Sequence, residues 1–177
     1  MADILLPPSP AAPTFHIREA TLADRAVIAH HRVSMFVEMG TLQLGNVEDL
    51  RDATMAYLAD AIPSGEYRGW LASLAAAPAR VVAGCGLHVR NIAPFPLESD
   101  GIETPIAAGR QAYVVNVFTE PDYRRQGLAR ELMQTVLAWT RDYGFDSVAL
   151  HATDVGRPLY ESLGFVTSNE MRLKRLS

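Results

Sequence analysis

Cysteine is nearly absent from this sequence, because Cys85 is the single cysteine among 177 residues. One thiol cannot form an internal disulfide or a site with several thiolate ligands, which excludes small disulfide-bonded secreted scaffolds and cysteine-rich metal modules. Its position inside a predicted strand favours a small buried hydrophobic residue over a nucleophile. We therefore expect a cytoplasmic protein without a bound metal.

An excess of positive charge is also missing. Lys and Arg total 16 against 20 Asp and Glu, which gives a net charge of −4. Such a chain has no general basic field to attract a nucleic-acid backbone. No run approaches the roughly 20 apolar residues that cross a bilayer, and residues 1–6 lack the basic flank of a secretion signal. We expect neither nucleic acid nor a membrane as a partner.

The composition indicates one folded domain. Hydrophobic residues make up 49% of the chain and charged residues 20%, which is typical of globular proteins. The length fits a single domain with a sizeable core. Four of the eleven prolines fall between Pro7 and Pro13. We therefore predict a flexible proline-rich leader over residues 1–14 and one domain over residues 15–177.

Hydrophobic periodicity predicts a strand over residues 15–18, followed by two helices. The first helix has Thr21 as its N-cap and runs to about Val37; the second covers residues 47–62 and stops at residues 63–65. A hairpin of residues 70–75 and 80–90 follows, with Ala77-Pro78 as the turn. Residues 91–109 are interpreted as a long loop or as paired irregular strand ends.

The second half alternates strands and helices. We predict a strand over residues 111–118 buried on both faces, a helix over 127–143, a buried strand over 147–152 and a short helix over 156–163. Residues 165–167 and 170–173 are predicted to form a terminal strand pair.

The junction between the strand at 111–118 and the following helix has the features of an anion site. The first turn of a helix leaves backbone N–H groups unpaired and carries the positive end of the helix dipole. Gly127 lets a ligand approach the backbone there, and Arg124 and Arg125 add positive charge. The junction lacks the lysine of a P-loop, and Gly84-Cys85-Gly86 lacks the third glycine and the helix of a dinucleotide motif.

Two segments resemble one known family. The run Arg124-Arg125-Gln126-Gly127-Leu128-Ala129 is similar to the pyrophosphate loop of the GNAT (GCN5-related N-acetyltransferase) superfamily. Leu159-Tyr160-Glu161-Ser162-Leu163-Gly164-Phe165 resembles a late segment of the same superfamily. The resemblance extends over roughly residues 15–175. It implies an α/β (α+β) GNAT fold, with a mixed, mostly antiparallel central sheet flanked by helices.

The resemblance also implies acetyl-CoA as cosubstrate and assigns residues to it. The strand backbone at Val117, Phe118 and Thr119 would pair with the pantetheine arm. The loop Arg124, Arg125, Gln126, Gly127, Leu128 and Ala129 would hold the pyrophosphate. Thr153 or Asp154 would contact the CoA arm where many members have an asparagine. Tyr160 would be the catalytic acid that protonates or hydrogen-bonds the departing thiolate.

The general base is not assigned by the resemblance. Where some members carry a carboxylate, this chain has Tyr113, so direct carboxylate catalysis is in doubt. A base or a water path is still required, because only a neutral amine attacks a thioester. The remaining candidates are Glu38, His88, His151 and Glu120.

The implied reaction is direct transfer of an acetyl group to a primary amine of a small molecule or peptide. A non-catalytic acyl-CoA-binding module is the alternative, and a phosphate-loop hydrolase is disfavoured by the missing lysine. The identity of the amine, and whether the acyl group is acetyl or longer, stay open. The edge of the terminal strand pair could join two copies into a homodimer.

Overall fold

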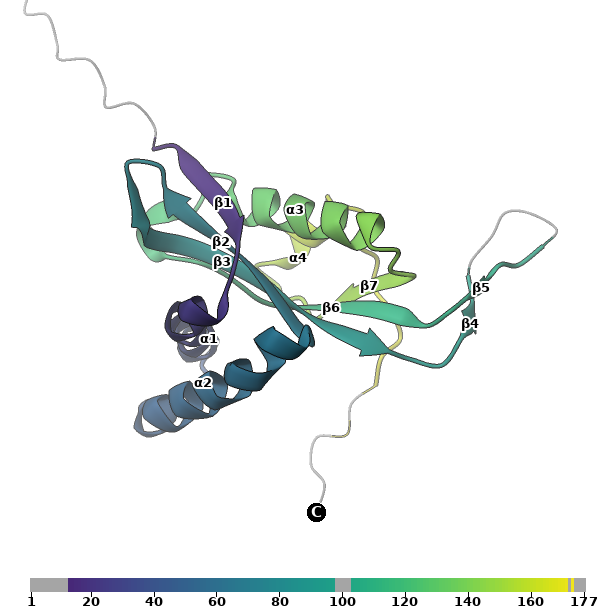
Figure 1. Ribbon diagram of the computed structural model, residues 1–177, viewed down its shortest axis with the longest axis horizontal. Coiled ribbons are helices and arrows are strands. Elements are labelled where there is room, and N and C mark those ends of the chain that lie inside the picture. The colour runs from purple at the N-terminus through teal and green to yellow at the C-terminus, as the bar shows by residue number, and fades with distance from the viewer. Residues whose placement is uncertain (1–12, 98–102, 172, 174–177) are drawn as a thin grey trace, which may run out of the picture.

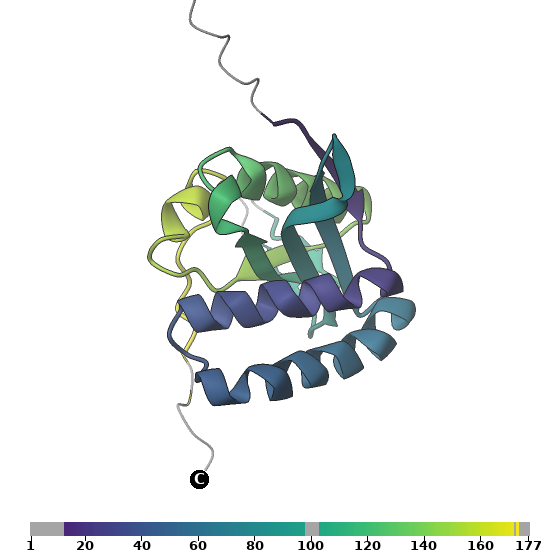
Figure 2. The same cartoon turned by 90° about the vertical axis from the view of Figure 1, so that its left-hand side faces the viewer.

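A computed structural model describes residues 13–97, 103–171 and 173. Its centre is a twisted sheet with helices on both faces (Figure 1). Turning the molecule by 90° shows α1 and α2 lying together on one face and α3 on the other (Figure 2). The predicted leader falls mostly in residues 1–12, which lie outside the described residues. In the described part of the chain no helix is long and apolar enough to cross a membrane.

The five-stranded sheet has the order β1-β2-β3-β6-β7. Its strands are β1 (Phe15–Glu19), β2 (Tyr67–Leu74), β3 (Ala77–Asn91), β6 (Arg110–Thr119) and β7 (Ser147–Leu150). Neighbours are antiparallel except β6 and β7, which run parallel. A parallel pair needs a crossover, which α3 provides. This mixed, mostly antiparallel sheet confirms the predicted fold class.

One face of the sheet is covered by two helices. A 3₁₀ turn (Leu22–Asp24) leads into α1 (Arg25–Glu38), and the Asp24 carboxylate accepts the Thr21 backbone N–H at 2.8 Å. A second 3₁₀ turn (Leu44–Asn46) precedes α2 (Val47–Ser64). The buried cluster between these helices and the sheet contains Ile28, Leu58, Ala61, Tyr67 and Leu71.

The opposite face packs on α3 (Leu128–Asp142), which follows a 3₁₀ turn (Pro121–Tyr123). Leu128, Leu132, Met133 and Val136 of this helix are buried against the sheet and form its apolar face. The short α4 (Arg157–Glu161) contributes the partly buried Tyr160 to the same cluster. These packed elements fix the far end of β6 relative to the start of α3.

Two predicted boundaries shift by two residues. The helix α2 passes the predicted end at Ile62 and continues to Ser64, and it stops within the predicted segment 63–65, at Gly65 in the left-handed conformation with φ +78°. The hairpin turn falls at residues 75–76, and Ala77-Pro78 already belongs to β3. The β2–β3 register shifts between Ser73 and Leu74, so some residues of β3 opposite this point form no hydrogen bond with β2. Proline, which has no backbone N–H, is tolerated at such a position.

The second half of the chain shows a larger difference. The predicted terminal strand pair is absent from the described residues: residues 165–171 form no strand, while 172 and 174–177 lie outside the description. β7 is therefore the edge of the sheet, and its four residues are half-buried rather than buried. The alternative of paired irregular ends for residues 91–109 is confirmed by β4 (Phe95–Pro96) and β5 (Ile106–Ala107), which form an arm seen on the right of Figure 1.

Candidate functional site

The sheet opens between β6 and β7. The two strands pair only from Gln111 with Ser147 to Val114 with Leu150, and β7 ends there. β6 continues to Thr119 and stays paired with β3 on its other side, up to Ala83 opposite Thr119. Within the described residues no strand pairs with the β7 side of β6 after Val114. This segment contains the predicted Val117, Phe118 and Thr119, and its free edge can accept an extended ligand as an additional strand.

A bulge lies at the start of this free edge. Gly86 pairs with Val115 and Gly84 with Phe118, so that Cys85 alone faces the two residues Asn116 and Val117. Asn116 has φ +55°, which is uncommon outside glycine. A bulge leaves the extra residue without its ladder partner and therefore provides a backbone N–H or C=O for a ligand. Cys85 itself is a packing residue as predicted, and burial raises the pKa of its thiol to about 12.

The loop after β6 supplies the second element of the site. Arg125 has φ +62° and Gly127 has φ +86°, so the chain turns sharply immediately before α3. The first intrahelical bond joins the Glu131 N–H to the Gly127 carbonyl, at 3.1 Å. The amides of Leu128 and Ala129 precede this bond and are free to donate to an anion.

The two loop arginines differ in their surroundings. The Arg124 guanidinium binds both carboxylate oxygens of Glu38, at 2.7 and 2.8 Å, and its Nε donates to the Thr119 carbonyl. It therefore ties the end of α1 to the end of β6 and would have to leave Glu38 to reach a phosphate. Arg125 is exposed beside the loop amides, and Gln126 Nε2 donates to the Asp122 carbonyl at 3.3 Å.

Tyr160 lies on α4, on the face of the sheet that packs against α3. It packs against Phe165 and is half-buried, and burial together with the neighbouring Cys85 raises the pKa of its hydroxyl to about 12. The phenol is therefore protonated at neutral pH and can donate a hydrogen bond. Thr153 lies in the turn before α4, where its Oγ1 accepts the Gly156 N–H at 3.1 Å, whereas Asp154 is exposed near Arg157.

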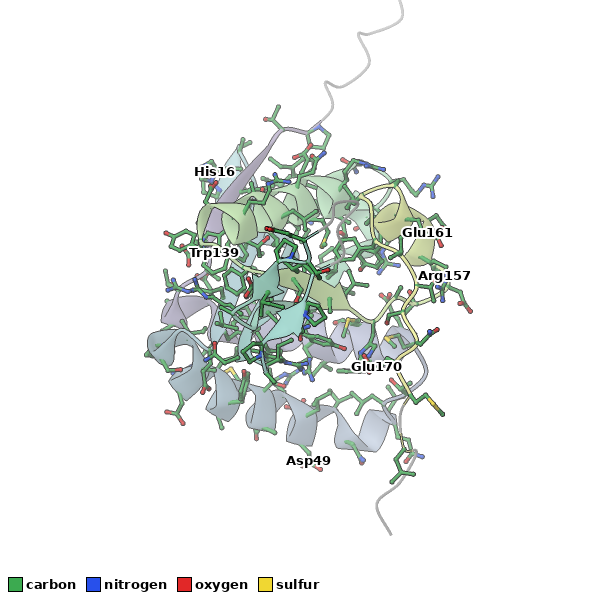
Figure 3. The ribbon with its side chains drawn as sticks, turned by 90° about the vertical axis from the view of Figure 1, so that its right-hand side faces the viewer. His16, Asp49, Trp139, Arg157, Glu161 and Glu170 are labelled. Carbon is green, nitrogen blue, oxygen red and sulfur yellow. The ribbon has the colours of Figure 1, made fainter. Side chains whose placement is uncertain are left out.

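The surface next to α4 also carries the C-terminal segment. Arg157 and Glu161 lie on α4, and Glu170 lies on the segment that follows it (Figure 3). Glu170 Oε1 is 2.8 Å from His151 Nε2, and the Tyr113 hydroxyl is 2.9 Å from the same nitrogen. His151 is thus an exposed residue of this cluster. It is exposed because β7 is an edge strand.

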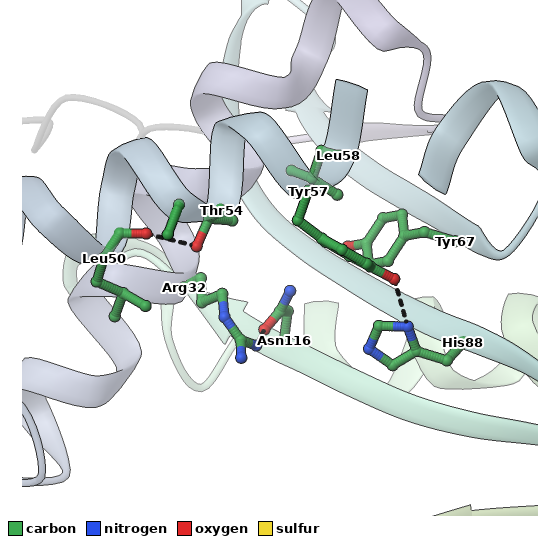
Figure 4. Close-up of a pocket in the computed structure, with 9 residues that line it drawn as sticks. Arg32, Leu50, Thr54, Tyr57, Leu58, Tyr67, His88 and Asn116 are labelled. Carbon is green, nitrogen blue, oxygen red and sulfur yellow. Dashed lines mark hydrogen bonds between the residues drawn. The ribbon is translucent and has the colours of Figure 1, made fainter. Parts of the chain in front are cut away.

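A cavity of about 300 Å³ lies on the other face of the sheet, between α1, α2 and the bulge. Figure 4 shows its residues: Arg32, Leu50, Ala53, Thr54, Tyr57, Leu58, Tyr67, His88 and Asn116. Asn116 belongs to both the cavity wall and the bulge, and its Oδ1 accepts a hydrogen bond from Arg32 Nη1 at 2.7 Å. The cavity therefore reaches the point where the free edge of β6 begins.

His88 is the one predicted base candidate that lines this cavity. Its Nδ1 lies 2.8 Å from the Tyr57 hydroxyl, and in Figure 4 the other ring nitrogen is on the side that faces Asn116 and Arg32. Burial, Arg90 and Arg32 lower the pKa of His88, so its imidazole is neutral at pH 7. Glu38 is bound to Arg124, and Glu120 lies against His30 at 3.1 Å.

Sequence reasoning missed Arg32, Tyr57 and Asn116. A signal existed for Asn116, since it is a polar residue inside the otherwise apolar run of residues 112–118, and asparagine tolerates the left-handed conformation. Arg32 and Tyr57 lie on separate helices and share no local spacing. Within residues 13–97, 103–171 and 173, no three His, Cys, Asp or Glu side chains are grouped so that they could hold a metal ion.

Three features together define a class of fold: the strand pair β6–β7 that opens, the bulge in β6, and the loop that leads into α3. Comparison with known proteins identifies this class. The chain belongs to the acetyltransferase (GNAT) family, whose family model matches residues 39–165. This result confirms the resemblance noted in the sequence. The family match takes in the bulge, the loop, the cavity residues on α2 and β3, and Tyr160.

Solved structures agree over nearly the whole chain. A GCN5-related N-acetyltransferase from Ralstonia eutropha JMP134 has a TM-score of 0.78 and 25% identity, covering 92% of this chain and 99% of that chain. A predicted acetyltransferase from Clostridium acetobutylicum, crystallised with acetyl-CoA, has a TM-score of 0.73 at 18% identity, covering 92% and 96%. The second similarity concerns the fold alone.

Curated relatives match over shorter stretches. Human N-acetyltransferase 8 is 31% identical over 67 residues, which is 36% of this chain and 30% of that protein. The aminoglycoside N(6')-acetyltransferase type 1 of Acinetobacter genomosp. 13 is 35% identical over 57 residues, which is 30% of this chain and 39% of that protein. The chain thus spans between 30% and 39% of the length of these two relatives.

Proposed function

We propose that this protein transfers an acetyl group from acetyl-CoA directly to the primary amine of a small molecule or peptide. The observation that carries the proposal is the place of the bulge. Asn116 joins the free edge of β6, which suits a pantetheine arm, to a cavity on the opposite face, which suits an amine. A donor and an acceptor bound in these two places would meet at one backbone position.

The donor would be held mainly by backbone groups. The pantetheine arm would pair with Val117, Phe118 and Thr119 along the free edge of β6. The pyrophosphate would accept hydrogen bonds from the amides of the Arg125–Ala129 segment, at the positive end of the α3 dipole. Arg125 would add charge at this position. An unpaired N–H at the bulge would stabilise the oxyanion of the tetrahedral intermediate.

His88 is proposed as the general base. In the tautomer in which Nδ1–H donates to the Tyr57 oxygen, Nε2 carries a lone pair toward the cavity. The amine nitrogen attacks the thioester carbon and its proton passes to Nε2, directly or through one water. The C–N bond forms, the C–S bond breaks, and the products are an amide and the CoA thiol. Tyr57 would act as a positioning residue.

Tyr160 would stabilise the departing sulfur. A thiol has an ordinary pKa of about 8.5, well below the value of about 12 for Tyr160, so complete proton transfer from the phenol to the thiolate is unfavourable. Hydrogen-bond donation to the developing thiolate is the role that fits this difference. The thiolate then gains its proton from solvent, and His88 releases the proton taken from the amine to solvent.

Replacing Tyr160 tests this role. We expect Tyr160→Phe to lower kcat by about 10²-fold while leaving the affinity for CoA within about 3-fold, because only the transition state loses a donor. Release of free thiol measures kcat, and isothermal titration measures affinity. Tyr143→Phe is a matched control, since Tyr143 is exposed on the far end of α3. An equal loss in both variants would remove Tyr160 from the mechanism.

The wild-type protein separates the proposal from its alternative. Acetyl-CoA is incubated with a panel of amines, and thiol release and the acetylated product are both measured. Binding of acetyl-CoA without acetylation of any amine would favour the non-catalytic acyl-CoA-binding module. A cytoplasmic location and a homodimer are part of the proposal, and fractionation and light scattering measure them.

A further inference from the structure

The charge of the cavity on the α1–α2 face gives information about its ligand. The cavity residues include Arg32 and the neutral His88, but no aspartate or glutamate. The Arg90 charge also reaches His88 and Tyr57, and Glu66, which is exposed at the end of α2, is the one carboxylate that influences Tyr57. The cavity is therefore positively charged, although the whole chain has a net charge of −4.

Arg32 is the main source of this charge. It lies on α1 and is half-buried, its Nη1 donates to the neutral Asn116 amide, and its guanidinium stacks over the Phe36 ring at 4.9 Å. No carboxylate forms an ion pair with it among the described residues, whereas Arg18, Arg51, Arg68 and Arg124 each have one. A guanidinium has five N–H donors in a planar fork, and most of those of Arg32 stay available.

An arginine that is removed from water without a counter-ion is costly to a fold. Its desolvation is offset when a ligand brings the missing negative charge, and guanidinium groups bind carboxylate and phosphate through two parallel hydrogen bonds. A polycationic acceptor would meet Arg32 and Arg90 without any compensating acid in the cavity wall. The volume of about 300 Å³ is at the lower end of small-molecule sites.

We propose that the acceptor is a small amine that also carries an anionic oxygen group, a carboxylate or a phosphate, and that Arg32 binds this group. The inference rests on the proposed function and names the substrate class of the same site. Its amine would lie toward the bulge and His88. The positive cavity also favours the neutral form of that amine, because like charges disfavour an ammonium.

Matched acceptor pairs test the inference. Glycine is compared with glycinamide and phosphoethanolamine with ethanolamine, and spermidine represents polycations. We expect kcat/KM to be at least about 10-fold higher for the anionic member of one pair, because a hydrogen bond between two charged groups is stronger than one to a neutral group. The pair that shows the preference distinguishes carboxylate from phosphate. Glycinamide has the less basic amine, so any preference for glycine is not caused by amine ionisation.

Variants assign the preference to Arg32. Arg32→Gln keeps a hydrogen-bond donor for Asn116. It should abolish the preference by raising KM for the anionic acceptor about 10- to 100-fold. The kcat/KM for the neutral acceptor should stay within about 3-fold of the wild-type value. Arg32→Lys, which keeps the charge without the fork, should be intermediate. Arg25→Gln removes the same charge from an exposed position of α1 and should change nothing. Thermal melting verifies that each variant is folded.

Three outcomes overturn the inference, and they differ from one another. A wild-type preference for ethanolamine, glycinamide or spermidine contradicts it and leaves the acetyltransferase proposal intact. A fall in kcat for anionic and neutral acceptors alike in Arg32→Gln would mean that Arg32 acts at the reacting centre. If acetyl-CoA binds and no amine is acetylated, the proposed function itself fails.

Discussion

At the scale of single residues, four side chains of the cavity have properties that depend on partners from distant parts of the sequence. His88 on β3 contacts Tyr57 on α2, and Arg32 on α1 contacts Asn116 on β6. The resemblance in the sequence pointed to Gly127 and Tyr160, because each belongs to a contiguous motif. It could not point to Arg32 or Tyr57, since long-range packing alone brings their elements together.

The pH dependence of His88 can be predicted from its surroundings. Burial and two nearby arginines lower its pKa below 6.5, so kcat/KM, expressed per neutral free amine, should be retained down to a pH below that value and then fall as His88 gains a proton. His88→Gln should lower kcat by about 10²- to 10⁴-fold. The pH profile of kcat/KM with one acceptor measures both effects.

Tyr57→Phe provides the internal control for this prediction. It removes the hydroxyl partner of Nδ1 and keeps the ring, so it should shift the acid limb of the profile and lower kcat less than His88→Gln does. An unchanged acid limb in His88→Gln would show that another group is the base.

At the scale of elements, the first turn of α3 combines two requirements in one residue. Gly127 has φ +86°, which side-chain-bearing residues adopt only with strain, and open space surrounds the position of a Cβ atom. A side chain would therefore extend into the region that an approaching phosphate needs. The same helix ends near Gly144, which has φ +66° and equally open surroundings.

These two glycines form a matched pair of test positions. Gly127→Ala and Gly144→Ala should each lower the free energy of unfolding by about 1–2 kcal/mol, from the left-handed backbone alone. Only Gly127→Ala should also weaken CoA binding, by about 10-fold or more. Urea unfolding and isothermal titration measure the two quantities. Equal CoA affinities in the two variants would mean that the loop amides do not hold the pyrophosphate.

The elements themselves were largely predictable from the sequence, because periodicity and caps are local properties. The helical pattern of α3 and the apolar run of β6 were both found. The predicted terminal strand pair is absent from the described residues, since a strand forms only when a neighbour offers an unpaired edge in register, which a short alternating segment does not reveal. The position of the bulge at Asn116 depends on pairing with β3, so the sequence of β6 alone does not reveal it.

At the scale of the whole molecule, buried titratable groups link folding to pH. His31 is 2% exposed and lies between the Phe118 ring and Gly84. Burial, with a smaller contribution from His30, lowers the pKa of His31 to about 4, whereas in the unfolded chain it is near 6.5. Between these values the unfolded state binds more protons than the native state, so stability falls as the pH is lowered.

The expected loss between pH 6.5 and pH 4 is about 3 kcal/mol from His31. His88 acts in the same direction. A further loss follows between pH 3.8 and pH 2, where Asp24 is protonated, because the bond to Arg18 lowers its pKa to about 2 in the native state. Urea unfolding at a series of pH values measures these losses. In His31→Gln the free energy of unfolding should change less with pH above pH 4. An unchanged slope in that variant would contradict the assignment.

In the proposed function, different parts of the fold bind the acetyl donor and the amine acceptor, and this separation determines how acceptor specificity can change. β6 and the start of α3 would bind the nucleotide, while α1 and α2 form the outer wall of the cavity. Leu50, Ala53 and Thr54 on α2 can therefore be exchanged without touching a donor-binding residue. New acceptor preferences should be reachable through this one helix, with the shared transfer chemistry left intact.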